Sequence, residues 1–494
     1  ASVWQLPVIF IIENNGYGLS TPTSEQYRCK NLADRAKGYG MKSHIIDGNN
    51  VLEVYQTIKK VATAIRKQPE PVLIECKTFR MRGHEEASGT KYVPKELMEY
   101  WAQKDPVKNY EQFLVQEGLL NDTQIADTRA SIKAEIEAGL EKAYAEPEVK
   151  ADIDKELADV YAPHTFEIQT PSGPTKEVRL IDAISDGLRL AMEKHSDLVL
   201  MGQDIAEYGG VFKITAGFVE AFGKERVRNT PLCESAILGA GLGLSLKGYK
   251  AMVEMQFADF VSSGFNQIVN NLAKLHYRWG HAANVVIRMP AGGGVGAGPF
   301  HSQCNEAWFT HTPGLKVVFP SDPYDAKGLL LASFEDPNPV MFFEHKALYR
   351  SLSTEVPEGY YTIPIGKAKV VRAGAAASII TYGMGVHWAK AAVEEMGADV
   401  EILDLRSLTP LDFEAIEQTV AKTNRVLILH EDILSGGIGG DIAAYIGEHC
   451  FEELDAPILR VASLNTPVPF AKSLEAAFLP QERLIKQLEK LLAY

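Results

Sequence analysis

Short apolar runs alternate with amphipathic stretches along most of the chain. Residues 8–12 and 72–76 are apolar at successive positions, which is typical of strands buried on both faces of a sheet. Over residues 51–65, apolar side chains recur at steps of three and four, which predicts an amphipathic helix. Because strands and helices alternate, the pattern predicts an α/β fold with parallel sheets.

The same alternation divides the rest of the chain into further units. Residues 169–175 contain turn formers and no apolar period, so we expect a linker over residues 162–177. The linker would separate a first region, residues 1–161, from a second unit over 178–350 and a third over 351–494. The strands expected in these two units are residues 198–201, 250–254, 283–289, 316–319, 377–381, 399–405 and 425–430.

The stretch from residue 122 to about residue 161 is acidic and has a helical pattern. Its apolar side chains form one stripe, made by Ile132, Ile136, Leu140 and Tyr144. Such a stripe predicts a helix that packs on a core with this face and turns its acidic face to solvent.

Composition narrows the possible partners and compartments. The 494 residues carry 50 basic and 64 acidic side chains, which gives a net charge of −14. Such a surface favours a basic protein as a partner and makes nucleic acid an unexpected one. No apolar run approaches the roughly 20 residues of a membrane span. The five cysteines are scattered without a C-x-x-C spacing, so we expect neither a disulfide framework nor a zinc site. A reducing compartment fits best, which is the bacterial cytosol or, in a eukaryote, the mitochondrial matrix.

The first residues carry no initiator Met, signal peptide or basic leader. They enter the first apolar run at Val8 after only seven positions. Since a domain rarely begins in mid-strand, we expect further residues upstream.

Two glycine-rich segments are candidate ligand loops. Residues 292–297 satisfy the pattern G-x-G-x-x-A after an expected strand, and residues 436–440 form a second such loop. A dinucleotide loop must also open a helix, whereas Pro299 and His301 follow the first loop. We therefore expect a mobile or ligand-facing loop and not a nucleotide site.

Three ionisable side chains follow expected strands: His84, His301 and Glu234. Ligands of α/β proteins bind at the carboxyl ends of parallel strands, so each is a candidate site residue. Taken alone, each histidine could equally have a structural role. Glu234 could equally be an ordinary acidic residue in the first turn of a helix. A carboxyl group at that place could share a proton with a ligand nitrogen.

Longer segments carry a more specific signal. In the first region they are residues 12–18 (Ile-Glu-Asn-Asn-Gly-Tyr-Gly), 20–28 and 79–84, and further on they are residues 231–234, 256–260, 301–303 and 342–346. The first of them resembles the second half of the thiamine-diphosphate motif. The other two early segments resemble the α subunit of the decarboxylating component of branched-chain 2-oxo acid dehydrogenase complexes. Residues 178–494 resemble the β subunit of the same component along their whole length.

This resemblance implies an α–β fusion that lacks the front of its α part. The fold implied is α/β, with transketolase-like, thiamine-diphosphate-binding parallel-sheet domains and a transketolase C-terminal-like domain. Residues 1–161 would be the C-terminal part of the α-like, pyrophosphate-binding domain, and residues 178–350 the β-like, pyrimidine-binding domain. Residues 351–494 would be the transketolase C-terminal-like domain.

The resemblance also implies two cofactors, thiamine diphosphate and Mg²⁺. By the family pattern, Asn15 gives its side-chain oxygen and Tyr17 its backbone carbonyl to Mg²⁺, a cation that prefers hard oxygen ligands. Arg80 and His84 match positions that face the phosphates and the reaction channel.

At the other end of the cofactor, the resemblance implies that Glu234 hydrogen-bonds the aminopyrimidine ring nitrogen. Phe260 would stack on that ring, and Gln256 would contact the cofactor too. His301 would be an acid–base or orienting group for the acyl intermediate. Glu234, His301 and His84 are thus the candidate catalytic residues, and the cofactor is expected to span the α-like and β-like regions.

The activity implied is oxidative decarboxylation of a small 2-oxo acid, with transfer of the acyl group to a lipoyl-bearing acyltransferase. The expected assembly is a homodimer of fused chains within a multienzyme complex. Residues 231–234 and 342–344 favour branched-chain 2-oxo acids. Three alternatives stay open: the pyruvate enzyme, an inactive scaffold that only docks on the acyltransferase core, and transketolase-like sugar transfer, which would need a basic, histidine-rich site that the sequence does not offer.

Two positions depart from the family pattern. Glu13 stands where branched-chain enzymes commonly have an arginine for the phosphate. Glu85 follows His84 where animal relatives have a regulated serine, so kinase control at that position is not implied.

Overall fold

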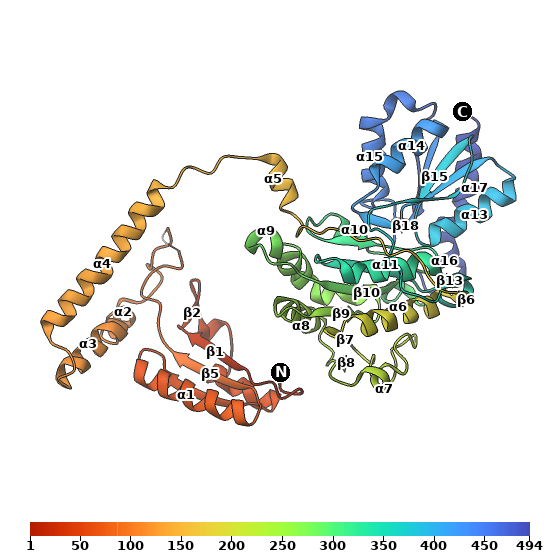
Figure 1. The fold of residues 1–494 in the computed structure, drawn as a ribbon. Helices are drawn as coiled ribbons and strands as arrows, with labels where there is room; N and C mark the ends of the chain where they lie inside the picture. The colour runs from red at the N-terminus through yellow and green to blue at the C-terminus, as the bar shows by residue number, and fades with distance from the viewer. Residues whose placement is uncertain (86) are drawn as a thin grey trace. The chain divides into compact units, whose positions relative to one another are not determined.

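The computed structural model describes residues 1–85 and 87–494, and it divides into two compact units (Figure 1). Unit 1 comprises Ala1–Lys150 and unit 2 comprises Ala151–Tyr494. Within the described residues, no helix combines the length and the apolar character that a membrane span requires. The alternation of strands and helices predicted from the sequence is confirmed in both units, which are α/β with parallel sheets.

Unit 1 is built on a parallel sheet with the strand order β1-β5-β4. These strands are Ile9–Asn14, Val72–Lys77 and Lys42–Asp47, and the helix α1 (Val51–Lys67) packs on them. The core between α1 and the sheet is formed by Ile46, Val61, Ile65, Val72, Ile74 and Cys76. A short hairpin, β2 (Tyr17–Gly18) and β3 (Thr21–Pro22), follows β1.

The prediction that residues 8–12 are buried on both faces is wrong. In β1, Phe10 is 42% exposed and Ile11 53% exposed. Among the described residues, Ile9 is the one side chain of this edge strand that packs against the core of unit 1, and Phe10 and Ile11 are left exposed. Residues 72–76 are mostly buried, as expected, because they lie in the central strand β5.

Helices follow β5 in unit 1: α2 (Lys95–Ala102), α3 (Pro106–Gln116) and α4 (Asp122–Ala145). The acidic helix predicted from residue 122 is therefore present, although it ends at Ala145. Its apolar stripe is not packed on a core, because the four side chains are between 47% and 84% exposed. Periodicity gives the apolar face of a helix but not the surface that covers it.

The larger sheet of unit 2 has the strand order β17-β11-β12-β10-β9-β7-β8. All neighbours in it are parallel except β17, which runs antiparallel to β11. The strands are β17 (Ser407–Thr409), β11 (Lys316–Val318), β12 (Val340–His345), β10 (Val285–Ala291), β9 (Lys250–Glu254), β7 (Leu198–Gly202) and β8 (Val227–Asn229).

Helices cover this sheet and bury its apolar side chains. They are α6 (Leu180–Lys194), α7 (Phe218–Phe222), α8 (Glu234–Leu246), α9 (Leu275–Trp279), α10 (Ala307–Thr310), α11 (Pro323–Glu335) and α12 (Leu348–Ser351). The pair α6 and α11 packs together over one core, which includes Leu188, Leu330 and Phe342. The helix α8 packs on β9 and on the 3₁₀ helix η3 (Ala258–Gly264).

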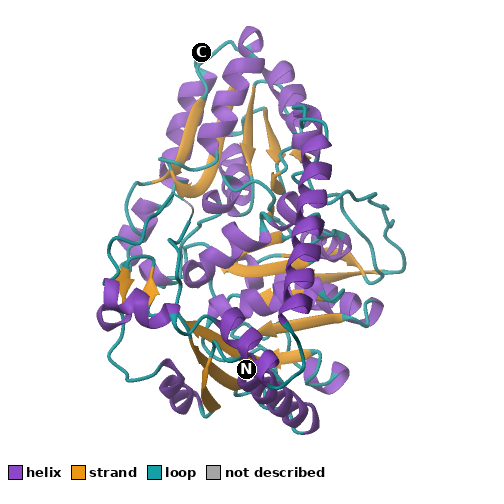
Figure 2. Cartoon of the chain, turned by 90° about the vertical axis from the view of Figure 1, so that its left-hand side faces the viewer, coloured by secondary structure: helices purple, strands orange, loops and turns teal. Residues whose placement is uncertain are grey.

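A second sheet occupies the C-terminal part of unit 2, with the order β14-β16-β15-β18-β19. Its strands are β14 (Lys369–Arg372), β16 (Val400–Asp404), β15 (Ala377–Thr381), β18 (Val426–Ile433) and β19 (Leu459–Ser463). Helices lie on both sides of these strands (Figure 2): α13 (Met384–Met396) packs with α17 (Gln481–Leu492), and α14 (Phe413–Thr423) packs with α15 (Gly439–His449). The short α16 (Lys472–Phe478) precedes α17.

The segment expected as a linker is part of unit 2 and is hydrogen-bonded to the rest of it. After α5 (Ile153–Ala158), Tyr161 donates its hydroxyl hydrogen to the backbone oxygen of Leu315 at 2.9 Å. Further along, the backbone N–H of Thr362 donates to the oxygen of Gln169, and β6 (Thr175–Arg179) pairs with β13 (Ser353–Pro357). The domain boundaries expected from the sequence stay predictions.

Candidate functional site

The loops and helix starts that follow the parallel strands in unit 2 carry four of the eight candidate residues. Gln203 follows β7, Gln256 follows β9, and the glycine-rich loop that leads to His301 follows β10. Glu234 is the first residue of α8, which follows β8. The sheet therefore presents these side chains along one edge, where α/β proteins bind ligands.

The carboxyl group of Glu234 is half-buried and held by a neighbour. Its Oε1 accepts a hydrogen bond from Nε2 of the buried Gln203 at 3.1 Å. The helix that begins at Glu234 packs on η3, which carries Phe260. Gln256 is oriented by Asp204, whose Oδ2 accepts a hydrogen bond from its Nε2 at 2.8 Å.

An aromatic cluster brings two of the candidates together. The His301 ring lies edge-on to Phe257 and Phe260, with centroids 4.8 and 5.4 Å apart, and Phe257 is 5.5 Å from Phe260. Phe260 and His301 thus meet although the chain separates them by 41 positions. Phe257 was not a candidate from the sequence, where it was only part of a matching segment.

The loop of residues 292–297 uses its own N–H groups for carboxylates of this chain. The N–H of Gly293 donates to Oε1 of Glu431 at 2.6 Å, and those of Gly294 and Gly296 donate to Glu475 at 2.9 and 3.1 Å. Backbone N–H groups in such turns form concavities that bind anions. The protein's own carboxylates occupy this one, so these three N–H groups are already bonded and not open to a phosphate.

Charged neighbours fix the base of this loop. His345 Nε2 lies 2.6 Å from Oε2 of Glu431, and Lys346 Nζ donates to the backbone oxygen of Gly292 at 2.6 Å. Burial alone would raise the pKa of Glu431, but His345, the Gly293 N–H and Lys346 outweigh it and hold the pKa below its ordinary value. Burial lowers the pKa of Lys346.

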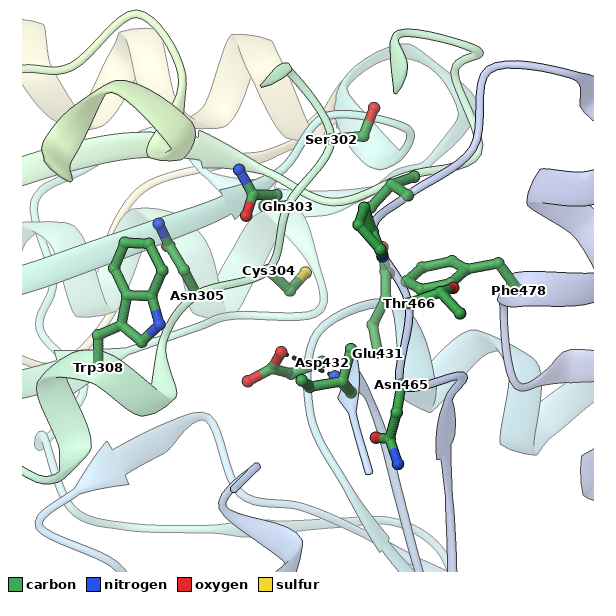
Figure 3. A pocket seen from close by; sticks show the side chains of 13 residues that line it. Ser302, Gln303, Cys304, Asn305, Trp308, Glu431, Asp432, Asn465, Thr466 and Phe478 are labelled. Carbon is green, nitrogen blue, oxygen red and sulfur yellow. Dashed lines mark hydrogen bonds between the residues drawn. The ribbon is translucent and has the colours of Figure 1, made fainter. Parts of the chain in front are cut away.

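A cavity of about 360 Å³ lies beside this cluster, between the loop after His301 and the ends of β18 and β19 (Figure 3). Cys304 and Asp432 are among its lining residues. Burial raises the pKa of the Cys304 thiol and raises that of Asp432 to about 7. Burial, aided by the charge of Asp432, raises the pKa of the neighbouring Glu306 to about 8.

In unit 1, the candidates lie at the ends of the adjacent strands β1 and β5. Asn14 points to the sheet, because its Nδ2 donates to Glu75 at 2.6 Å and to the Tyr27 hydroxyl at 3.1 Å. Asn15 is left in the following turn, where its Oδ1 accepts the N–H of Tyr17 at 3.0 Å. The structure thus distinguishes the two asparagines, and Asn15 is the one not anchored in the sheet.

Arg80 joins the same group and His84 does not. Nη2 of Arg80 donates to the Leu19 oxygen at 2.7 Å and to the Tyr92 hydroxyl at 3.0 Å. The Tyr92 ring in turn contacts Tyr17, at a centroid distance of 5.8 Å. His84 is exposed, and its ring forms no hydrogen bond and no ring contact with another described residue.

Glu75 is a residue that the sequence reasoning missed. It is fully buried in β5 and accepts hydrogen bonds from Asn14, Lys77 and the N–H of Ala33. Burial would raise the pKa of this carboxyl, but these three donors together hold it below its ordinary value. A single acid inside an otherwise apolar strand was the available signal, since a buried charge needs a partner.

The donor types of both units fit the implied cofactors. Mg²⁺ accepts amide and carbonyl oxygens, which Asn15 and Tyr17 offer. A carboxyl group and an aromatic ring, which Glu234 and Phe260 provide on the packed helices α8 and η3, fit an aminopyrimidine ring. In the part of the chain that the structure describes, no three acidic, histidine or cysteine side chains gather as a metal site.

Three family models match the chain. Residues 1–152 match the model "Dehydrogenase E1 component". Residues 176–351 match "Transketolase, pyrimidine binding domain", and residues 366–485 match "Transketolase, C-terminal domain".

Curated relatives align with the second part of the chain. The 2-oxoisovalerate dehydrogenase subunit beta of Bacillus subtilis is 47% identical over 305 residues, which cover 60% of this chain and 93% of that subunit. The pyruvate dehydrogenase E1 component subunit beta of the same organism is 41% identical over 312 residues, covering 62% of this chain and 96% of that subunit. A solved structure, described as "Split gene transketolase, inactive beta4 tetramer", is similar with a TM-score of 0.52 at 24% identity, covering 64% of this chain and 98% of its own, and it supports the fold alone.

Proposed function

The chain belongs to the family of E1 components of 2-oxo acid dehydrogenases, with an α-like part and a β-like part in one polypeptide, and on that premise we propose that it decarboxylates branched-chain 2-oxo acids. The proposed cofactors are thiamine diphosphate and Mg²⁺. The observation that carries the substrate class is the 47% identity to a 2-oxoisovalerate dehydrogenase subunit, against 41% to the pyruvate counterpart.

When bound, thiamine diphosphate would supply the carbon nucleophile and the electron sink that decarboxylation of a 2-oxo acid requires. In unit 1, Asn15 and the carbonyl of Tyr17 would hold Mg²⁺, and Arg80 would face phosphate. In unit 2, Gln256 would contact the cofactor and Phe260 would lie against its pyrimidine.

Proton transfers would fall to Glu234 and His301. The Glu234 carboxyl would hold a proton toward the pyrimidine nitrogen, and the hydrogen bond from Gln203 would orient it. His301, packed against Phe257 and Phe260, would give or take a proton at the reacting oxygen of the substrate. His84 stays a candidate for the same work, supported only by its place in a matching segment.

The test of the substrate class compares two 2-oxo acids on the full chain, supplied with thiamine diphosphate and Mg²⁺. We expect kcat/KM for 3-methyl-2-oxobutanoate to exceed that for pyruvate by at least about tenfold, because a pocket shaped for extra methyl groups gains about 1–3 kcal/mol for each. A preference for pyruvate would favour the pyruvate enzyme. No turnover of either acid would favour the docking scaffold.

The proposed partner is a lipoyl-bearing acyltransferase with a basic docking domain. Glu452 and Glu453, on the 3₁₀ turn after α15, are exposed beside the exposed ring of Phe451. Other acidic side chains in the same C-terminal part are Glu414, Glu417, Glu448 and Asp455. Together with the net charge of −14, they would speed encounter with a basic surface.

Association with the cognate acyltransferase fragment should therefore slow when salt is raised and when Glu452 and Glu453 are replaced by lysine. An association rate that ignores both changes would exclude electrostatic docking here. The proposed assembly is a homodimer of fused chains, and sedimentation that shows only monomer at micromolar concentration would contradict it.

A further inference from the structure

The loop between β10 and Ser302 carries His301, and the side chain of His301 does not anchor this loop by a hydrogen bond to any other described residue. Within the described part of the chain, the ring has only edge contacts to Phe257 and Phe260 and no hydrogen bond. Its position therefore depends on how the loop backbone is held.

Hydrogen bonds within the part of unit 2 that is built on the larger sheet hold the two ends of the loop together. The N–H of Gly292 donates to the oxygen of Gln303 at 3.2 Å. Gln303 is held in turn by Asp259, whose Oδ1 accepts its N–H at 3.2 Å and its side-chain Nε2 at 2.9 Å. These bonds hold the two ends of the loop, but they leave its middle unsupported.

The middle is held from the C-terminal part of unit 2. Glu475, on α16, spans the N–H groups of Gly294 and Gly296 with its two carboxylate oxygens. Glu431, at the end of β18, takes the N–H of Gly293. Both carboxylates are buried, at 4% and 7% exposure, and such charged acceptors make stronger hydrogen bonds than neutral ones.

The two acids differ in their other partners. Glu431 also pairs with His345, so it belongs to a cluster inside the fold. Among the described residues Glu475 forms no ion pair, and its side-chain hydrogen bonds go to the two loop N–H groups alone. A buried carboxylate is costly unless it is satisfied, so its bonds to this loop are what offset its burial.

From this arrangement we propose that Glu475 is a positioning residue for the decarboxylation reaction: it holds the middle of the 292–303 loop and thereby places the His301 ring. The proposal rests on the proposed function, since it assigns a role through His301. Glu475 lies about 170 positions after His301 in the sequence, on the helix α16.

The experiment compares Glu475→Gln and Glu475→Asp with the control Glu489→Gln. Glu489 is exposed on α17, and its replacement by Gln removes the same charge as Glu475→Gln. Gln keeps one acceptor oxygen but turns an NH₂ donor toward a loop N–H, and Asp is too short to span both groups. Backbone hydrogen exchange in the cofactor-free protein should speed up at residues 293–297 in both Glu475 variants and not in the control. Unchanged exchange there would overturn the proposal, whatever the activity of the enzyme.

Turnover then separates positioning from simple destabilisation. Glu475→Gln should lower kcat by about 10- to 100-fold, the range that displacement of a reacting group costs, with little change in KM. In a His301→Ala background the same substitution should have almost no further effect, because its action passes through His301. Equal losses in both backgrounds would overturn the proposal. Absence of turnover in the unmodified chain would instead refute the proposed function and leave the exchange result to decide on the loop.

Discussion

Replacing Gly292 by Ala should destabilise the protein by more than the same change at Gly296. Both glycines are left-handed, with φ of +88° and +70°, where an alanine costs roughly 1–2 kcal/mol. A Cβ at Gly296 would meet open space. A Cβ at Gly292 would overlap the His345 ring, so Gly296→Ala is a matched control that isolates this overlap.

The overlap adds a second contribution at Gly292 alone. Overpacking a buried site costs about 1–3 kcal/mol. If the His345 ring moves away to relieve it, the ring leaves Glu431, and a hydrogen bond to a charged group contributes about 1.5–3 kcal/mol. By either route Gly292→Ala should lose about 1–3 kcal/mol more than Gly296→Ala.

The assay is urea unfolding of the full chain followed by circular dichroism, with midpoints compared at unchanged slope. Gly292→Ala should have the clearly lower midpoint, and Gly296→Ala should lie between it and the unmodified protein. Equal midpoints for the two variants would refute the reasoning, because His345 would then not be packed against the loop.

Two further predictions concern buried charges in unit 2. Burial lowers the pKa of His430 to about 4 from an ordinary 6.5, so between these pH values the unfolded chain binds a proton that the folded chain does not. The free energy of unfolding should thus fall by about 3 kcal/mol as pH drops from 6.5 to 4. In unfolding measured as a function of pH, His430→Gln should flatten this slope, whereas substitution of the exposed His281 should not. An unchanged slope in His430→Gln would show that His430 titrates normally. Arg288, buried between Glu254 and Glu344, should cost about 3–5 kcal/mol when replaced by Met, because two buried carboxylates lose their cation. Adding Glu254→Gln and Glu344→Gln should recover much of that loss in thermal unfolding, and failure to recover would point to packing instead of charge.

The sequence predicted the class of fold because hydrophobic periodicity is local. Residues 198–201, 250–254 and 377–381 were expected as strands and lie in β7, β9 and β15. The same local signal failed for β1 and for the stripe on α4, since burial depends on a second layer that no local pattern describes.

The candidate site was predictable only where residues follow a strand or match a family segment. Phe260 and His301 became candidates in this way, and their rings lie in contact in the structure. Glu475 was not, because an acid on a helix normally faces solvent and only the packing of α16 on the glycine loop buries it. Glu75 gave a weak signal as a lone acid in an apolar strand.

The most direct test of the proposed function is release of carbon dioxide from 3-methyl-2-oxobutanoate by the full chain and by its Glu234→Gln variant. The assay contains thiamine diphosphate, Mg²⁺ and an artificial electron acceptor, and Glu220→Gln, exposed on α7, is the matched control. Glu234→Gln should lower the rate by at least about 100-fold, the scale of a lost acid–base contribution, because an amide cannot share the proton with the pyrimidine nitrogen. The control should keep the full rate. A Glu234→Gln variant that turns over at a near-normal rate would contradict the proposed function at its centre.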